Sequence, residues 1–358
     1  MIRVLVVDDS AFMRKLISDY INEDPDMTAA DTARNGKDAL EKARNGRFDV
    51  ITLDVEMPEM DGMEALCSIM ETCPHPVIMV SSLTRKGAQQ TITALESGAV
   101  DFVAKPSGSI SLDLHHVKEE IIEKIRTAAQ VEVKQKNEPP ASTVMHKAQD
   151  EPDGIFLEGK KTVAIATSTG GPKALQVLLS DLPKDLPAPV FVIQHMPPAF
   201  TRSLAERLNQ RSSLFVKEAE DGEIAKTGTV YIAPGGRHLA VRRMGRSLVT
   251  EVLDTSPVNG HRPSADVLFS SLAAVDGFSH VGIVLTGMGS DGSAGLVEMK
   301  NAQKCLLITE SQRTSIVYGM PKAARQRAAA EYSLDLGDIA GFLSASLLPG
   351  SKNRSDFS

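Results

Sequence analysis

Short apolar runs alternate with amphipathic stretches over residues 1–125. Between the first two runs, residues 12–21 place their apolar side chains on one face of a helix. Alternation of this kind predicts a parallel sheet with helices on both of its faces. The apolar runs occupy residues 3–7, 27–33, 49–53, 76–80 and 101–105.

A second region of the same kind follows and predicts another α/β domain. Around residues 234–237, Pro-Gly-Gly-Arg separates two strand-like runs, which favours a local antiparallel hairpin in an otherwise mostly parallel sheet. The expected strands lie at residues 162–167, 189–194, 229–234, 238–242, 280–287 and 305–310. The expected helices lie at residues 200–211, 264–275 and 321–329.

A polar stretch separates the two regions. Residues 126–160 contain three prolines and no sustained apolar period, which is typical of an interdomain linker. We therefore predict a first domain over residues 1–125, a linker over 126–160 and a second domain over 161–350. Both domains are expected to be doubly wound, the first flavodoxin-like and the second Rossmann-like.

Composition narrows the function classes. The 358 residues carry a formal net charge of −7, which argues against broad binding to nucleic acid or to anionic membranes. No stretch is long and apolar enough to cross a bilayer, and the first residues do not form a signal peptide. Cys67, Cys73 and Cys305 form no CxxC pair. These features favour a cytoplasmic protein without membrane insertion.

Acidic residues follow two of the first domain's predicted strands. Asp8 and Asp9 follow the first strand, and Asp54 follows the third. The carboxyl ends of the strands in a parallel sheet lie at one edge, so these carboxylates are expected to be close together. They would repel each other unless a cation such as Mg²⁺ bound between them. Ser81 and Lys105 end the fourth and fifth strands at the same edge. This set of groups suits a site that accepts a phosphoryl group.

The segments VLVVDDS, LDVEMPEMDG, MVSS and AKP resemble the motifs of two-component receiver domains. The resemblance implies that Asp54 is the phosphoacceptor and that a histidine kinase is the phosphodonor. It further implies Mg²⁺ ligands at Asp8, Asp9 and Asp54, a switch hydroxyl at Ser81, a phosphate-contacting Lys105 and an aromatic switch residue at Phe102.

In the second domain, residues 163–175 read VAIATSTGGPKAL, an apolar run followed by hydroxyls, glycines and a helix start. The loop lacks the spacing of a phosphate-binding fingerprint. It would instead suit a nucleophile, provided that a base and an acid follow neighbouring strands. His195 and Asp291 each come just after an apolar strand, so Ser168, His195 and Asp291 form a candidate triad.

Each of these residues also has an ordinary interpretation. Ser168 could cap the following helix, His195 could be a loop histidine, and Asp291 could belong to an Asp-Gly turn. His238 and His261 are rival histidines. A catalytically silent binding domain therefore remains an alternative. A DNA-binding output domain is disfavoured because the second region is strand-rich and has no basic recognition helix.

The segments ATSTGGPKAL, QHMP, YIAPGG, PVNGHRPSADVLF and TGMGSDG together resemble the catalytic domain of the chemotaxis protein-glutamate methylesterase (CheB) family. The resemblance implies a nucleophile at Ser168, a base at His195 and its orienting acid at Asp291, with an oxyanion site at Thr169 and Met288. It implies phosphorylation-activated demethylation of glutamate methyl esters, and deamidation of glutamines, on methyl-accepting chemotaxis receptors. No cofactor is expected for hydrolysis.

Overall fold

The computed structural model describes residues 1–105, 111–131, 157–302 and 305–348, with only the backbone of 111–116. The chain divides into two compact units, Met1–Lys147 and Ala148–Ser358. The first unit has strands β1 (Ile2–Val7), β2 (Met27–Ala33), β3 (Val50–Asp54), β4 (Val77–Ser81) and β5 (Asp101–Ala104). Its helices are α1 (Ala11–Asn22), α2 (Gly36–Asn45), α3 (Gly62–Thr72), α4 (Arg85–Ser97) and α5 (Ser111–Ala128).

The five strands of the first unit form a parallel sheet in the order β2-β1-β3-β4-β5. Helices start where they do because a polar side chain caps the first turn. Ser10, Asn35, Asp61 and Thr84 each accept a hydrogen bond from a backbone N–H three residues later. Strands β3 and β4 are buried along their whole length. Their carboxyl ends therefore present Asp54 and Ser81 at one edge of the sheet.

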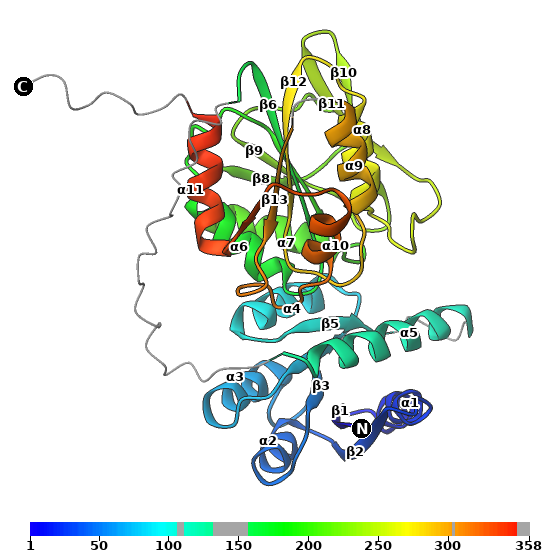
Figure 1. Ribbon diagram of the computed structural model, residues 1–358. Coiled ribbons are helices and arrows are strands. Elements are labelled where there is room, and N and C mark those ends of the chain that lie inside the picture. The colour runs from blue at the N-terminus through cyan, green and yellow to red at the C-terminus, as the bar shows by residue number, and fades with distance from the viewer. Residues whose placement is uncertain (106–110, 132–156, 303–304, 349–358) are drawn as a thin grey trace, which may run out of the picture. The chain divides into compact units, whose positions relative to one another are not determined.

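The second unit is larger (Figure 1). Its strands are β6 (Lys160–Thr167), β7 (Val190–Gln194), β8 (Phe215–Glu218), β9 (Thr229–Ile232), β10 (His238–Met244), β11 (Ser247–Leu253), β12 (Phe278–Val284), β13 (Cys305–Glu310) and β14 (Tyr332–Leu334). Its helices are α6 (Gly171–Asp181), α7 (Phe200–Arg211), α8 (Ala265–Ala273), α9 (Ser293–Ala302), α10 (Met320–Arg327) and α11 (Leu336–Leu347).

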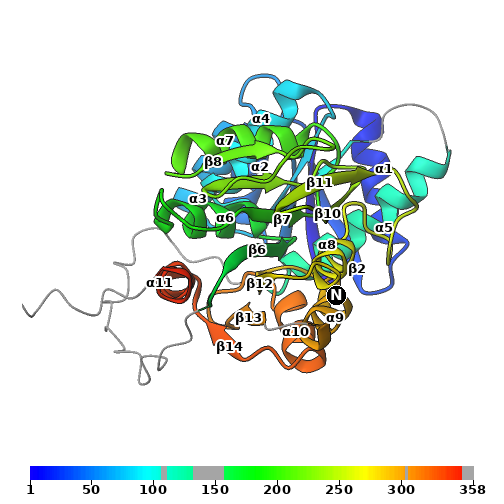
Figure 2. The same ribbon diagram turned by 90° about the horizontal axis from the view of Figure 1, so that it is seen from above.

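Seven of these strands form a parallel sheet in the order β14-β13-β12-β6-β7-β9-β8. From β6 the chain winds first toward β7 and later returns to β12 on the other side of β6. Accordingly, α6, α7 and α11 lie on one face of the sheet and α8, α9 and α10 on the other (Figures 1 and 2). The winding reverses between β6 and β12, the place where doubly wound proteins bind ligands.

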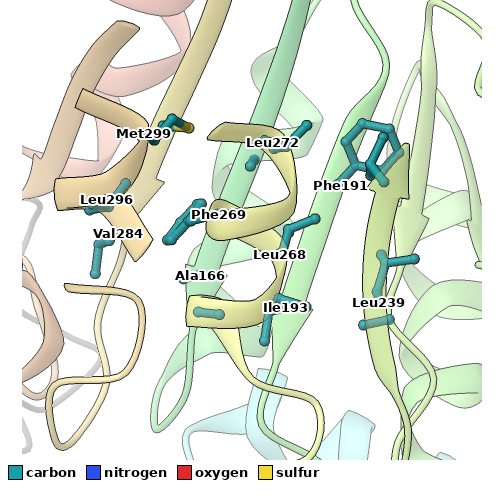
Figure 3. Packing of buried hydrophobic residues seen from close by; sticks show 14 of the residues in the cluster. Ala166, Phe191, Ile193, Leu239, Leu268, Phe269, Leu272, Val284, Leu296 and Met299 are labelled. Atoms are coloured by element: carbon teal, nitrogen blue, oxygen red, sulfur yellow. The ribbon is translucent and has the colours of Figure 1, made fainter. Parts of the chain in front are cut away.

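Helix α8 is anchored in the core of the second unit. Leu268, Phe269 and Leu272 are fully buried and point into a cluster that includes Ala166 of β6 and Ile193 of β7 (Figure 3). Helix α9 packs closely beside α8 because Gly295 has no side chain. A Cβ at that position would lie 2.7 Å from the carbonyl oxygen of Asp266. The two helices therefore pack closely together on the same face of the sheet.

These arrangements confirm the predicted fold class: two doubly wound α/β domains plus a small antiparallel hairpin. The predicted position of the hairpin is wrong. Strand β9 pairs in parallel with β7 and β8 inside the large sheet, while β10 pairs with β11. The hairpin turns at Gly245, whose φ is +60°. Residues 247–253, not recognised as a strand from the sequence, provide the partner.

The predicted domain limits of 125, 160 and 350 remain proposals. Helix α5 continues to Ala128, and β6 begins at Lys160. Most of the predicted linker falls outside the described residues, as does Pro106 of the AKP segment. Within the parts of the chain that the structure describes, no helix is long and apolar enough to cross a membrane.

Candidate functional site

The first candidate site lies at the carboxyl edge of the five-stranded sheet. Lys105 Nζ is 2.9 Å from Asp8 Oδ2 and 2.8 Å from Asp54 Oδ2, and both carboxylates are buried. Burial raises the pKa of Asp54 to about 6; the ammonium of Lys105 opposes this effect and the charge of Asp8 adds to it. One ammonium therefore only partly compensates two adjacent carboxylates.

The same edge contains a third carboxylate, that of Asp9, which is exposed. One oxygen from each of Asp8, Asp9 and Asp54 can be chosen so that all lie within 4.8 Å of one another. A set made of carboxylate oxygens alone is the donor chemistry that Mg²⁺ takes, with water completing the shell. The residues present therefore fit a magnesium ion.

Two further residues predicted for this domain lie at different depths. Ser81 is buried at the end of β4 and pairs in register with Ala104, the residue before Lys105. Phe102 is buried two positions earlier in β5, and the ammonium of Lys124 from α5 lies 5.0 Å from its ring centre. Ser81 is thus at the acidic edge, whereas Phe102 is packed under α5.

The second candidate site begins at Ser168, directly after β6. The backbone N–H of Ser168 donates to Thr286 O (3.1 Å), and its carbonyl accepts the N–H of Gly171 (2.8 Å). Ser168 does not cap α6: the capping position is Gly170, where φ is +79°, and no side chain bonds the first turn. A Cβ at Gly170 would lie 2.9 Å from Ile316, so only glycine fits this tight turn.

His195 directly follows β7, the strand next to β6, just as Ser168 directly follows β6. Thr167 pairs with Gln194, and the N–H of His195 donates to Thr167 O (3.2 Å), so Ser168 and His195 leave adjacent strands in register. Adjacent strands are about 4.8 Å apart, which places the two residues side by side. His195 Nε2 is 2.8 Å from Asp291 Oδ2. Its Nδ1 is buried and has no hydrogen-bond partner among the described residues.

Asp291 is buried where the loop after β12 meets the start of α8. Oδ2 accepts the N–H of Ala265 (2.6 Å), and Oδ1 accepts the hydroxyl of Ser264 (2.7 Å) and the N–H of Asp266 (3.2 Å). Burial alone would raise the pKa of Asp291, but His195 and these donors hold it at about 2. Asp291 is therefore an ionised carboxylate that caps a helix and contacts a histidine.

The predicted oxyanion residues flank Ser168. Thr169 is buried in the turn after β6, and Met288 is half-buried in the loop after β12. Thr286 joins these loops: its hydroxyl donates to Thr169 O (2.9 Å) and accepts the N–H of Val317 (2.9 Å). The structure thus brings Ser168, His195, Asp291, Thr169 and Met288 to one edge, at the reversal between β6 and β12.

The rival histidines occupy different environments. His238 is fully buried and structural, because Nδ1 accepts the N–H of Ser264 (3.2 Å) and Nε2 contacts Ser256 O (3.1 Å). The ring of His261 stacks on that of His195, with ring centres 4.0 Å apart and planes within 4°. Burial, and then the charge of His195, lower the pKa of His261 to about 4.

Sequence reasoning missed several residues that support this site. Ser264 and Thr286 resemble ordinary loop and strand-end residues, and only the fold brings them to Asp291 and Ser168. Gln194 carried a detectable signal: an amide side chain at the end of the otherwise apolar run PVFVIQ, directly before His195. Its side chain is buried and donates to Ser168 O.

Comparisons with known proteins identify the family of each domain. Residues 4–115 match the response regulator receiver domain model, and residues 163–343 match the CheB methylesterase model. A protein-glutamate methylesterase/protein-glutamine glutaminase of Halalkalibacterium halodurans is 50% identical over 91% of this chain and 92% of its own length. A Pyrococcus horikoshii protein of the same description is 45% identical over 94% of this chain and 91% of its own length.

A solved structure supports the second unit separately. The CheB methylesterase catalytic domain of Thermotoga maritima is 40% identical, covers 52% of this chain and 98% of its own, and superposes with a TM-score of 0.50. Fold, site and relatives together define a response regulator with a receiver domain and a second, doubly wound domain. The chain belongs to the CheB methylesterase family, and the resemblance drawn from its motifs is confirmed.

Proposed function

We propose that this chain hydrolyses glutamate γ-methyl esters and deamidates glutamines on methyl-accepting chemotaxis receptors, with Ser168, His195 and Asp291 as its triad. The observation that carries the proposal is the hydrogen bond between His195 Nε2 and the ionised Asp291. The bond keeps the proton on Nε2 and leaves the lone pair on Nδ1. This buried nitrogen is the base available beside Ser168.

Hydrolysis proceeds in two steps. Ser168 Oγ attacks the side-chain carbonyl carbon while its proton moves to His195 Nδ1, and Asp291 stabilises the resulting imidazolium. Backbone groups at Thr169 and Met288 stabilise the oxyanion. His195 returns the proton to the leaving methanol or ammonia, which leaves a glutamyl ester on Ser168. Water then cleaves this ester with the same base and releases glutamate.

In the receiver domain, Asp54 accepts a phosphoryl group from a chemotaxis histidine kinase. Asp8, Asp9 and Asp54 would hold Mg²⁺, which neutralises charge on the phosphoryl oxygens when bound. Lys105 contacts both buried carboxylates and becomes available to the phosphoryl group once a second cation shares them. Ser81 ends the neighbouring strand as the switch hydroxyl, and Phe102 is the aromatic switch residue. Phosphorylation raises the hydrolytic rate of the second domain.

The decisive assay is release of labelled methanol from methylated receptor membranes by the full chain, with and without a small-molecule phosphodonor. The Ser168→Ala variant should lose several orders of magnitude in kcat. Ser180→Ala removes an exposed hydroxyl of α6 and should leave the rate unchanged. Wild-type protein that releases no methanol in the presence of the phosphodonor would exclude the proposal. Asp54→Asn should remove only the response to the phosphodonor.

A further inference from the structure

One buried amide contacts the backbone of two members of the proposed triad. Gln194 Nε2 donates to Ser168 O (3.0 Å) and to His195 O (3.3 Å). The side chain is 2% exposed. The two carbonyls belong to loops that leave different strands, β6 and β7, so the amide connects them across the strand boundary.

The hydrogen-bonding groups around this amide determine which way it is oriented. Both neighbouring groups are carbonyl oxygens, so only the NH₂ end of the amide can face them; the opposite orientation would bring three oxygens together. The Oε1 end packs against α6, where a Cβ on Gly171 would lie 2.0 Å from it. Gly171 thus gives the amide the space that it needs at the first turn of α6.

Restraint at Ser168 O has a consequence beyond the serine itself. The carbonyl of Ser168 and the N–H of Thr169 belong to one planar trans peptide, so they point in opposite directions. Fixing the oxygen with the N–H of Gly171 and with Gln194 therefore fixes the direction of the Thr169 N–H. The same amide holds the carbonyl of the base.

We propose that Gln194 is a positioning residue for the reaction, setting Ser168, the Thr169 N–H and His195 in register with one another. This role rests on the proposed function, because it acts through the triad. Gln194 donates its two hydrogen bonds to backbone carbonyl oxygens and not to the Ser168 hydroxyl or the His195 ring. Its loss should therefore reduce the rate of the chemical step and leave substrate binding unchanged, because small displacements of a nucleophile or base are costly to kcat.

The test uses the full chain with phosphodonor and compares Gln194→Met with the wild type. Methionine has nearly the same length and no hydrogen-bond donor. We expect a fall of 10-fold or more in kcat, on the order of what misplacement of reacting groups costs, with KM within about twofold. Gln176→Met, a similar change at a half-buried position in α6, is the matched control and should retain wild-type kcat and KM.

The positioning role is wrong if a fully folded Gln194→Met protein keeps the wild-type kcat, or if only its KM changes. Neither outcome affects the test of the proposed function, which depends on Ser168→Ala. If the methionine variant does not fold, Gln194→Leu carries the same comparison, because it is shorter and also has no hydrogen-bond donor. A measurement on the wild type is independent of both variants. The side-chain amide hydrogens of Gln194 should exchange slowly with deuterium in NMR spectra, and fast exchange of both would refute the proposal.

Discussion

Replacing Asp291 by asparagine should destabilise the second unit as well as stop catalysis. The carboxylate accepts hydrogen bonds from Ser264, Ala265 and Asp266 in addition to contacting His195. An asparagine keeps one acceptor oxygen but directs its NH₂ group at donors. Each buried donor that is left without an acceptor costs about 1–3 kcal/mol. Loss of the triad acid should lower kcat on the order of 10⁴-fold.

Part of that stability depends on pH. The shift in the pKa of Asp291 determines whether the free energy of unfolding rises or falls as the pH falls. The carboxyl pKa is lowered from 3.8 to about 2 on folding. The unfolded chain therefore binds more protons in this range, and stability falls as the pH falls. The difference between the folded and unfolded pKa of Asp291 corresponds to about 2 kcal/mol of stability. This contribution is fully present above pH ~5, about half lost near pH 3 and lost completely below pH ~2. The Asn variant lacks this contribution at every pH.

The free energy of unfolding of the second unit can be measured in the full chain by denaturant-dependent hydrogen exchange. Mass spectrometry reads the exchange on peptides from residues 160–348. The unfolding free-energy difference between wild type and Asp291→Asn should shrink between pH 5 and pH 3. Asp266→Asn is the matched control, since burial raises the pKa of Asp266 and its contribution has the opposite pH trend. A wild-type-to-variant difference that stays constant over this range would refute the assignment of an ionised, helix-capping Asp291.

Three further outcomes are expected. Gly171→Ala places a Cβ 2.0 Å from Gln194 and should cost about 1–3 kcal/mol with a lower kcat, measured by thermal unfolding and methanol release. Thr286→Val removes a hydroxyl that both donates and accepts a backbone hydrogen bond, and should lower the free energy of unfolding by about 1–3 kcal/mol. Lys105→Ala removes the cation that competes at Asp54, so Mg²⁺ should bind more tightly by calorimetry; unchanged or weaker binding would contradict this reading.

The fold was predictable because strand-forming runs and helix starts are local signals. The strand ends that carry Asp8, Asp54, Ser168 and His195 could be read from the end of each apolar run, and parallel pairing places them on common edges. The position of the hairpin could not be read in this way. Residues 238–242 suit either an antiparallel return onto β9 or a new pair with later residues, and only packing against α8 distinguishes the two.

Supporting residues were harder to predict because their partners are far away in sequence. Ser264 and Asp291 are 27 residues apart, and Thr286 contacts Thr169 across 117 residues. The stacking of His261 on His195 depends on a tight loop in which Asn259 and Gly260 both have positive φ. Sequence patterns can indicate that such a turn exists, but not which side chain it places against His195.

The capping of α8 by Asp291 also has a dynamic consequence. The first turn of a helix is the part that frays most easily, and here it holds the acid partner of His195. When that turn opens, the carboxylate loses its donors and the histidine loses its fixed tautomer, although the rest of the sheet stays folded. We therefore expect warming to reduce turnover reversibly before the molecule melts, with the lost activity following the opening of a few amides at the start of α8.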